Sequence, residues 1–141
     1  MKLQTRTMLA LYSIIEAASH PDKLISATEI AERYGVSTHH LAKVLRELGR
    51  AGFVDSLRGV GGGYRFSGNS RRITLLDVIG QFEDIGVHTP ETAERRSDVG
   101  RAIELVLSEI DGIAKATFGS ITIDTFLKIV AKERERSAAA K

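Results

Sequence analysis

The chain has 141 residues, 43% of them hydrophobic, and a formal net charge of +2, so it can bury a core as one domain or as a compact head with an oligomerisation element. It contains no cysteine, which excludes disulfides, thiolate nucleophiles and thiolate-held zinc or iron–sulfur sites. No stretch approaches the ~18 apolar residues of a membrane span, so we expect a soluble, cytoplasmic protein without a membrane partner.

The charge is unevenly distributed along the chain. Residues 1–72 hold 11 Lys and Arg against 6 Asp and Glu, whereas residues 73–141 hold 9 against 12. A basic N-terminal half suits a polyanion, because neutralising phosphates releases bound counterions. An ordinary solvated surface could have the same charges, so this feature leaves both interpretations open.

Two helices are predicted first along the chain. Apolar residues recur at spacings of three and four from Leu3 to Ala18, which is typical of one helix face, and the turn at residues 20–22 ends the helix. Ser26, with Glu29 three residues later, has the pattern of a capping box that opens a second helix. Gly35 is expected to end that helix in the left-handed conformation.

The segments Ile25–Tyr34 and Ser37–Arg50 have the lengths and spacing of a DNA-binding helix-turn-helix. The second helix would enter the major groove and present its N-terminal polar residues to base edges. The alternative is a plain helical hairpin with a polar exposed face. The residues assigned to DNA contact in this pair of helices are Thr28, Ser37, Thr38, His39, His40, Lys43 and Arg46.

Residues 53–57 and 63–67 predict two short strands joined by a glycine-rich turn that begins at Arg58. A helix-turn-helix followed at once by a hairpin is the winged form of the motif, and an arginine on such a turn can approach the minor groove. The alternatives are a tight turn with an exposed Arg58, and a phosphate-binding nucleotide loop. The latter would need a Gly-Lys-Ser/Thr ending and a following helix, which the sequence lacks.

The rest of the chain predicts a short helix over residues 73–82 and a polar segment over residues 83–98. A long helix with an apolar stripe and a last ordered segment, Ile121–Val130, follow. The expected organisation is a DNA-binding domain over 1–82, an effector or linker loop over 83–98, dimerisation helices over 99–131 and a flexible charged tail over 132–141. The apolar stripe consists of Ile103, Val106, Leu107, Ile110, Ile113 and Ala114.

From about Met1 to Val130 the chain resembles the IscR/NsrR type of bacterial winged helix-turn-helix transcription regulators. The resemblance is carried by the run from Ile25 to Ser37, the spacing of Leu41, Leu45 and Leu48, the run Gly52-Phe53-Val54, and above all the run Arg58-Gly59-Val60-Gly61-Gly62-Gly63-Tyr64.

The resemblance implies a mainly α fold with a small β-hairpin, and a homodimer in which a long helix after the wing crosses its partner. It also implies sequence-specific binding of double-stranded DNA, with a repressor role. Carried over by position, Ser37 and His39 would lie at the groove, Arg58 at the wing, and Lys2 and Arg6 near phosphates. Gly59 and Tyr64 of the glycine-rich run are also assigned to DNA contact.

The chain departs from this family in two places. Val60 stands where many relatives have proline, and residues 87–99 lack the three cysteines of cluster-binding relatives. The resemblance is therefore to a cysteine-free branch, for which no cofactor is predicted and the effector is unknown. His88, Glu91, Glu94 and Asp98 could hold a different metal or belong to a solvated loop, and their irregular spacing favours the loop.

The sequence also bears on two other classes of function. A winged helix can serve as a protein-interaction module that does not bind DNA, and a neutral or acidic surface on the third helix would favour that alternative. An enzyme is not expected, because no nucleophile–base pair or pair of carboxylates has a convincing spacing.

Overall fold

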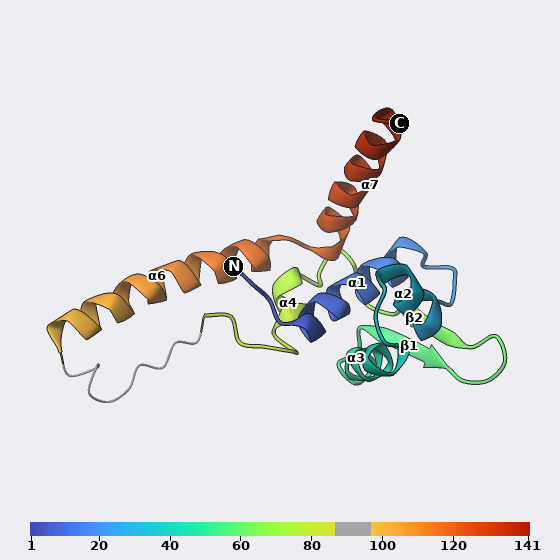
Figure 1. Cartoon of the computed structure of the whole chain (residues 1–141), viewed down its shortest axis with the longest axis horizontal. Helices are drawn as coiled ribbons and strands as arrows, with labels where there is room; N and C mark the ends of the chain where they lie inside the picture. The colour runs from blue at the N-terminus through green and yellow to red at the C-terminus, as the bar shows by residue number, and fades with distance from the viewer. Residues whose placement is uncertain (87–96) are drawn as a thin grey trace.

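The computed structural model describes residues 1–86 and 97–141. Figure 1 shows a head of short helices and one hairpin, from which two longer helices extend in different directions. The predicted fold class, mainly α with a small hairpin, is confirmed. In chain order the elements are α1 Thr5–Ser19, α2 Ala27–Tyr34, α3 Thr38–Arg50, β1 Val54–Leu57, β2 Gly63–Phe66, α4 Leu75–Ile79, α6 Asp98–Ser120 and α7 Ile123–Ala139.

The helix-turn-helix is bounded by the local signals that the sequence contains. The Ser26 hydroxyl accepts a 3.0 Å hydrogen bond from the backbone N–H of Glu29 and so caps α2. Gly35 ends α2 with φ 65° and ψ 37°, a left-handed conformation that costs glycine little. Ser37 caps α3 by accepting a 3.3 Å bond from the N–H of His40. The turn between α2 and α3 is therefore set by its own residues.

The hairpin is an antiparallel pair that runs in register from Val54 opposite Phe66 to Leu57 opposite Gly63. Its glycines allow close backbone approaches. A Cβ at position 62 would lie 2.3 Å from the Leu57 carbonyl oxygen, and one at position 63 would lie 2.9 Å from the carbonyl oxygen of Ile25. The hairpin can therefore pack against the segment that precedes α2.

The core lies inside the head, where α1, α3 and α4 pack together with the first turn of α7. Apolar side chains spaced three and four residues apart place one face of each helix inside, which removes apolar surface from water. The largest fully buried apolar side chains are Ile14, Leu41, Leu45, Leu48, Val78, Ile79 and Ile123.

The start of the predicted 83–98 loop belongs to the head. Phe82 and Ile85 are 3% and 8% exposed. The Glu83 carboxylate accepts hydrogen bonds from the Gln4 backbone N–H at 2.8 Å and from the Thr7 hydroxyl at 2.5 Å. The head therefore extends past residue 82, where the sequence predicted the domain boundary. The contacts that extend it join residues distant in sequence, so a short polar stretch contains no periodic pattern that would predict them.

The two C-terminal helices are longer than predicted. Ser97 caps α6 by accepting a 2.9 Å bond from Gly100 N–H, so the helix begins at Asp98, within the segment predicted as a loop over 83–98. Helix α7 continues to Ala139 in place of the flexible tail expected over 132–141. Alanine, lysine, arginine and glutamate all have high helix propensity, and Arg136 pairs with Glu133 three residues earlier at 3.1 Å.

The junction between α6 and α7 is held against the head by an isolated antiparallel bridge between Thr74 and Thr122. Leu75 N–H donates to the Ile121 carbonyl at 2.9 Å, and Ile123 N–H donates to the Ile73 carbonyl at 2.8 Å. The outer parts of both helices extend away from this anchor (Figure 1).

Candidate nucleic-acid interface

Helix α3 buries one face and exposes the other. Leu41, Val44, Leu45 and Leu48 are buried in the head. The N-terminal polar residues predicted to read bases are all exposed, and so are the two basic residues further along the helix. Because the burial follows the helical period, these polar side chains share one accessible surface. The exposed residues on it are Ser37, Thr38, His39, His40, Lys43 and Arg46.

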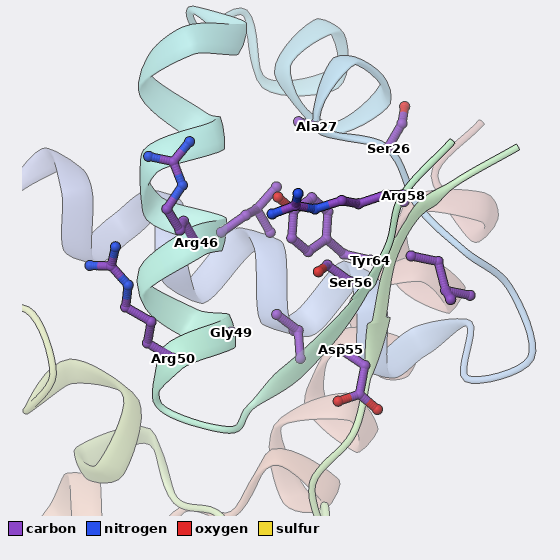
Figure 2. Close-up of a pocket in the computed structure, with 13 residues that line it drawn as sticks. Ser26, Ala27, Arg46, Gly49, Arg50, Asp55, Ser56, Arg58 and Tyr64 are labelled. Atoms are coloured by element: carbon purple, nitrogen blue, oxygen red, sulfur yellow. The ribbon is translucent and has the colours of Figure 1, made fainter. Parts of the chain in front are cut away.

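A groove of about 760 Å³ separates α3 from the hairpin. Arg46 and Arg50 border it from α3, and Arg58 borders it from the end of the hairpin. Figure 2 shows Arg58 pointing from the hairpin toward α3, whereas Arg46 and Arg50 extend from α3 away from the hairpin. Positive charge therefore lies on the exposed face of α3 and at the end of the hairpin beside it.

The charge on this groove is predominantly positive. Asp55 is its single acidic lining residue, against three arginines. Within the described part of the chain, none of the three arginines forms an ion pair. A guanidinium presents a planar fork of N–H donors that matches the oxygens of a phosphate. The groove therefore suits an anionic backbone.

The hairpin is fixed relative to the helix-turn-helix by main-chain bonds. Ile25 and Tyr64 each donate an N–H to the other's carbonyl, both at 2.8 Å. The Tyr64 side chain is half-buried and lines the groove. Gly59 has φ 102°, in the left-handed region, which lets the chain turn directly after Arg58. Arg58 points back toward α3, although the sequence predicted an arginine carried on the tip of the hairpin.

The remaining predicted DNA contacts lie outside this groove. Thr28 is exposed at the start of α2, and Lys2 is exposed ahead of α1. Arg6 is tied into the head: its guanidinium donates a 2.5 Å bond to the Phe82 carbonyl, lies 5.8 Å from the Phe82 ring centroid and is 3.9 Å from a Glu47 oxygen. Arg6 thus links α1 to α3 and to the segment after α4, a structural use that the sequence did not reveal.

Sequence reasoning missed Arg50 and Ser26 as groove residues. Arg50 follows Arg46 by four residues, which places the two on the same side of a helix, so helical spacing could have found it. Ser26 was assigned only to capping. Its position in the groove depends on the packing of the hairpin beside α2, for which the sequence has no local signal.

Helix α6 exposes most of its apolar stripe and has no buried residue in the described structure. Ile103, Val106, Ile110 and Ile113 are each more than half exposed. Leu107 and Ala114, which also belong to the predicted stripe, are half-buried. The stripe extends to Val99, which is 70% exposed and was not predicted.

Among the described residues, no group of three His, Asp or Glu residues could hold a metal ion. Asp98 pairs with Arg101, while His88, Glu91 and Glu94 lie outside the described residues. In the described helices, no segment is long and apolar enough to span a membrane.

Comparison with known proteins identifies the family. Residues 3–129 match the Rrf2 family, described as an iron-dependent transcriptional regulator. BadM of Rhodopseudomonas palustris, an HTH-type transcriptional regulator by name, is 47% identical over 137 residues, which cover 97% of this chain and 88% of BadM.

Solved structures of regulators share the fold. CymR (YrzC), the global cysteine regulator of B. subtilis, is similar with a TM-score of 0.77 and 26% identity, over 92% of this chain and 98% of CymR. The IscR of T. potens is similar with a TM-score of 0.74 and 25% identity, over 92% of this chain and 88% of IscR.

The family description mentions iron dependence. This chain cannot hold an iron–sulfur cluster through thiolates, because it has no cysteine. The sequence left open whether the fold is a DNA-binding regulator or a protein-interaction module, and the family decides for the regulator. The chain belongs to the Rrf2 family and is a DNA-binding winged-helix transcriptional regulator, not an enzyme.

Proposed function

We propose that the protein is a homodimeric, cytoplasmic repressor that binds a partly palindromic DNA site, with α3 of each subunit in a major groove. The observation that carries this proposal is the exposed polar face of α3, which bears Arg46 and Arg50 and has Arg58 of the hairpin beside it. A helix in the major groove lies between two phosphate backbones, so cations on the helix and on the hairpin beside it can pair with phosphates.

Base readout is assigned to the first turns of α3. The hydroxyls of Ser37 and Thr38 and the imidazoles of His39 and His40 can donate or accept hydrogen bonds, and Lys43 can reach guanine acceptors. Arg46, Arg50 and Arg58 are assigned to phosphates, because each is exposed and without an ion pair in the described residues. Phosphate contacts would fix the register and the α3 side chains would supply the specificity.

The glycine-rich end of the hairpin is assigned to the minor groove beside α3. Residues 59–62 have no side chain larger than valine, so the backbone can approach DNA closely. Arg58 stands at the entry to this turn and would remain near the phosphates that border the groove. Narrow A·T-rich steps would favour this approach because they concentrate negative potential.

The dimer is assigned to the apolar stripe of α6. A row of branched side chains more than half exposed on a helix that projects from the head is costly in water, and a second copy of the same stripe would cover it. A two-fold symmetric dimer would present its two α3 helices to half-sites about 34–36 Å apart. Occupancy of such a site would exclude polymerase and so repress transcription.

The proposal can be tested by selecting bound fragments from random duplex DNA and footprinting the selected site. We expect two protected half-sites in inverted orientation, one helical turn apart, and a log–log salt plot with a steep negative slope. Transcription from a promoter that carries the site should fall when the protein is added. A single protected half-site, or a rise in transcription, would contradict the dimer or the repressor role respectively.

A further inference from the structure

A second pocket lies between α1, α7 and the last residue of α2, and it shares no lining residue with the DNA-facing groove. Its volume is about 260 Å³, below the ~300–1,000 Å³ of sites that hold drug-sized ligands. The walls are mostly apolar, with Met8, Leu11 and Ile15 from α1 and Val130 from α7. Its size and lining suit a small apolar molecule.

Aromatic rings form part of the wall. Tyr12 of α1 and Tyr34 of α2 are stacked, with ring centroids 4.4 Å apart and an interplanar angle of 8°. Phe126 contributes a third ring from α7. Flat π surfaces interact best with other rings, in offset or edge-to-face arrangements, so this wall favours a planar ligand.

Two charged residues line the pocket, and they differ in how their charge is compensated. Glu16 is 6% exposed, and its carboxylate accepts a 2.6 Å hydrogen bond from the Tyr34 hydroxyl and another from the Arg33 guanidinium. Arg134 of α7 is exposed and forms no ion pair with any described residue. An anionic group on the ligand would therefore find its partner at Arg134.

We infer that this pocket binds a small planar molecule that has an aromatic or similarly apolar body and one carboxylate group. The apolar body would contact the tyrosine pair and Phe126, and the carboxylate would pair with Arg134. The inference deepens the proposed regulatory function. Ligand binding itself is argued from the pocket alone, and only its consequence for DNA binding rests on the proposed function.

The consequence follows from the place of Tyr34. It is the last residue of α2 and is followed directly by the Gly35 turn and α3. A ligand that contacts Tyr34 therefore touches the helix-turn-helix itself, and its occupancy would change how α3 is held. Because binding free energies are linked, DNA and the ligand must change each other's affinity by the same factor.

The binding test uses trans-cinnamate as the probe and its uncharged amide as the matched control, with the full chain free of DNA. Calorimetry should give one cinnamate per chain, with the amide binding ~fivefold or more weaker because it lacks the charge. Arg134→Gln should weaken cinnamate binding by a similar factor. Arg136→Gln, the same change on the same helix outside the pocket, should leave it unaltered. Equal affinities in the two variants, or no cinnamate binding at millimolar concentration, would overturn the inference.

A second variant tests the location. Val130→Phe should fill the pocket and abolish cinnamate binding while circular dichroism stays unchanged, whereas Ile129→Phe on the neighbouring, exposed position should still bind. If a second copy of the chain covers the pocket instead, cinnamate will bind more tightly as the protein is diluted toward the monomer. That result would also overturn the inference.

The coupling test measures DNA affinity with and without saturating cinnamate. We expect a change of about fivefold or more, which Val130→Phe should remove. An unchanged affinity in the wild-type chain would overturn the assignment of this pocket to regulation. If the unliganded protein fails to bind DNA, the proposed function fails while the calorimetric result stands, so the two failures are distinguishable.

Discussion

Ile25 and Tyr64 exchange two backbone hydrogen bonds of 2.8 Å, one in each direction, and thereby join the hairpin to the segment that leads into α2. Residues far apart in sequence thus hold α2, α3 and the hairpin in one arrangement. The spacing between the groove-facing side chains depends on this joint.

Replacing Gly63 with alanine should disrupt that joint. A Cβ at this position would lie 2.9 Å from the Ile25 carbonyl oxygen, so the two backbone segments must separate. We expect a loss of ~1–3 kcal/mol in the free energy of unfolding, as for other overpacked sites, together with weaker DNA binding. Urea denaturation measures the first effect. Gly49→Ala is the control, because its nearest neighbour would be 3.8 Å away, and it should not destabilise the protein.

The arginines beside α3 should contribute to DNA binding mainly through phosphates. Arg50→Ala and Arg58→Ala should each weaken binding to all sequences and reduce the slope of log affinity against log salt by about one. Fluorescence anisotropy over a salt series measures both quantities. Arg136→Ala provides the matched control, because Arg136 belongs to the last turns of α7, a helix that extends away from the head in Figure 1. An unchanged slope for Arg58→Ala would exclude it from the interface.

The α6 stripe should control the oligomeric state. Ile110→Asp would place a charge in each copy of the same apolar surface, which a dimer would then have to desolvate. We expect the dimer dissociation constant to rise by ~30-fold or more, as measured by sedimentation equilibrium. Ser108→Asp adds the same charge on the opposite side of the helix and should leave the dimer intact. If both variants remain dimeric, the interface lies elsewhere.

The buried carboxylate of Glu16 should be important for stability. It accepts hydrogen bonds from Tyr34 and Arg33, and its side chain is 8% exposed. Glu16→Ala would leave the tyrosine hydroxyl and the guanidinium without this partner, which should cost ~1–3 kcal/mol in the free energy of unfolding. Denaturation at pH 7 measures it, with Glu29→Ala, an exposed acidic residue of α2, as the comparison.

Tyr34 should make stability depend on alkaline pH. Burial, followed by its hydrogen bond to Glu16, raises the pKa of the Tyr34 hydroxyl above its usual value. The unfolded chain therefore loses this proton at lower pH than the folded chain does. The contribution of Tyr34 to stability is complete below pH ~10 and declines as the pH rises toward the folded pKa.

Comparison of two variants isolates this effect. Tyr34→Phe should show a smaller decline in the free energy of unfolding between pH 9 and 11 than the wild-type chain, because it has no hydroxyl to titrate. Tyr12→Phe removes the hydroxyl from the other residue of the stacked pair but keeps its ring. The free energy of unfolding of this variant should decline over the same pH range as that of the wild type. Parallel curves for the wild type and Tyr34→Phe would rule out this role for the hydroxyl.

Local chemistry in the sequence determined the helix-turn-helix and the hairpin. Ser26, Gly35 and Ser37 set helix ends through bonds to residues at most four positions away, and such bonds are readable from spacing alone. The apolar period of α3 likewise predicted its buried face. The glycine run predicted a tight turn, because few other residues tolerate its backbone conformations.

Tertiary packing alone decided where these elements lie relative to one another. Three features depend on residues distant in sequence: the pairing of Ile25 with Tyr64, the burial of Ile85 and the hydrogen bond from Arg6 to Phe82. No periodic pattern in the sequence predicts them. The same holds for the direction of Arg58 and for the pocket that brings Tyr34 beside α7. Contacts between elements depend on how their faces meet in three dimensions, whereas the sequence encodes each face separately.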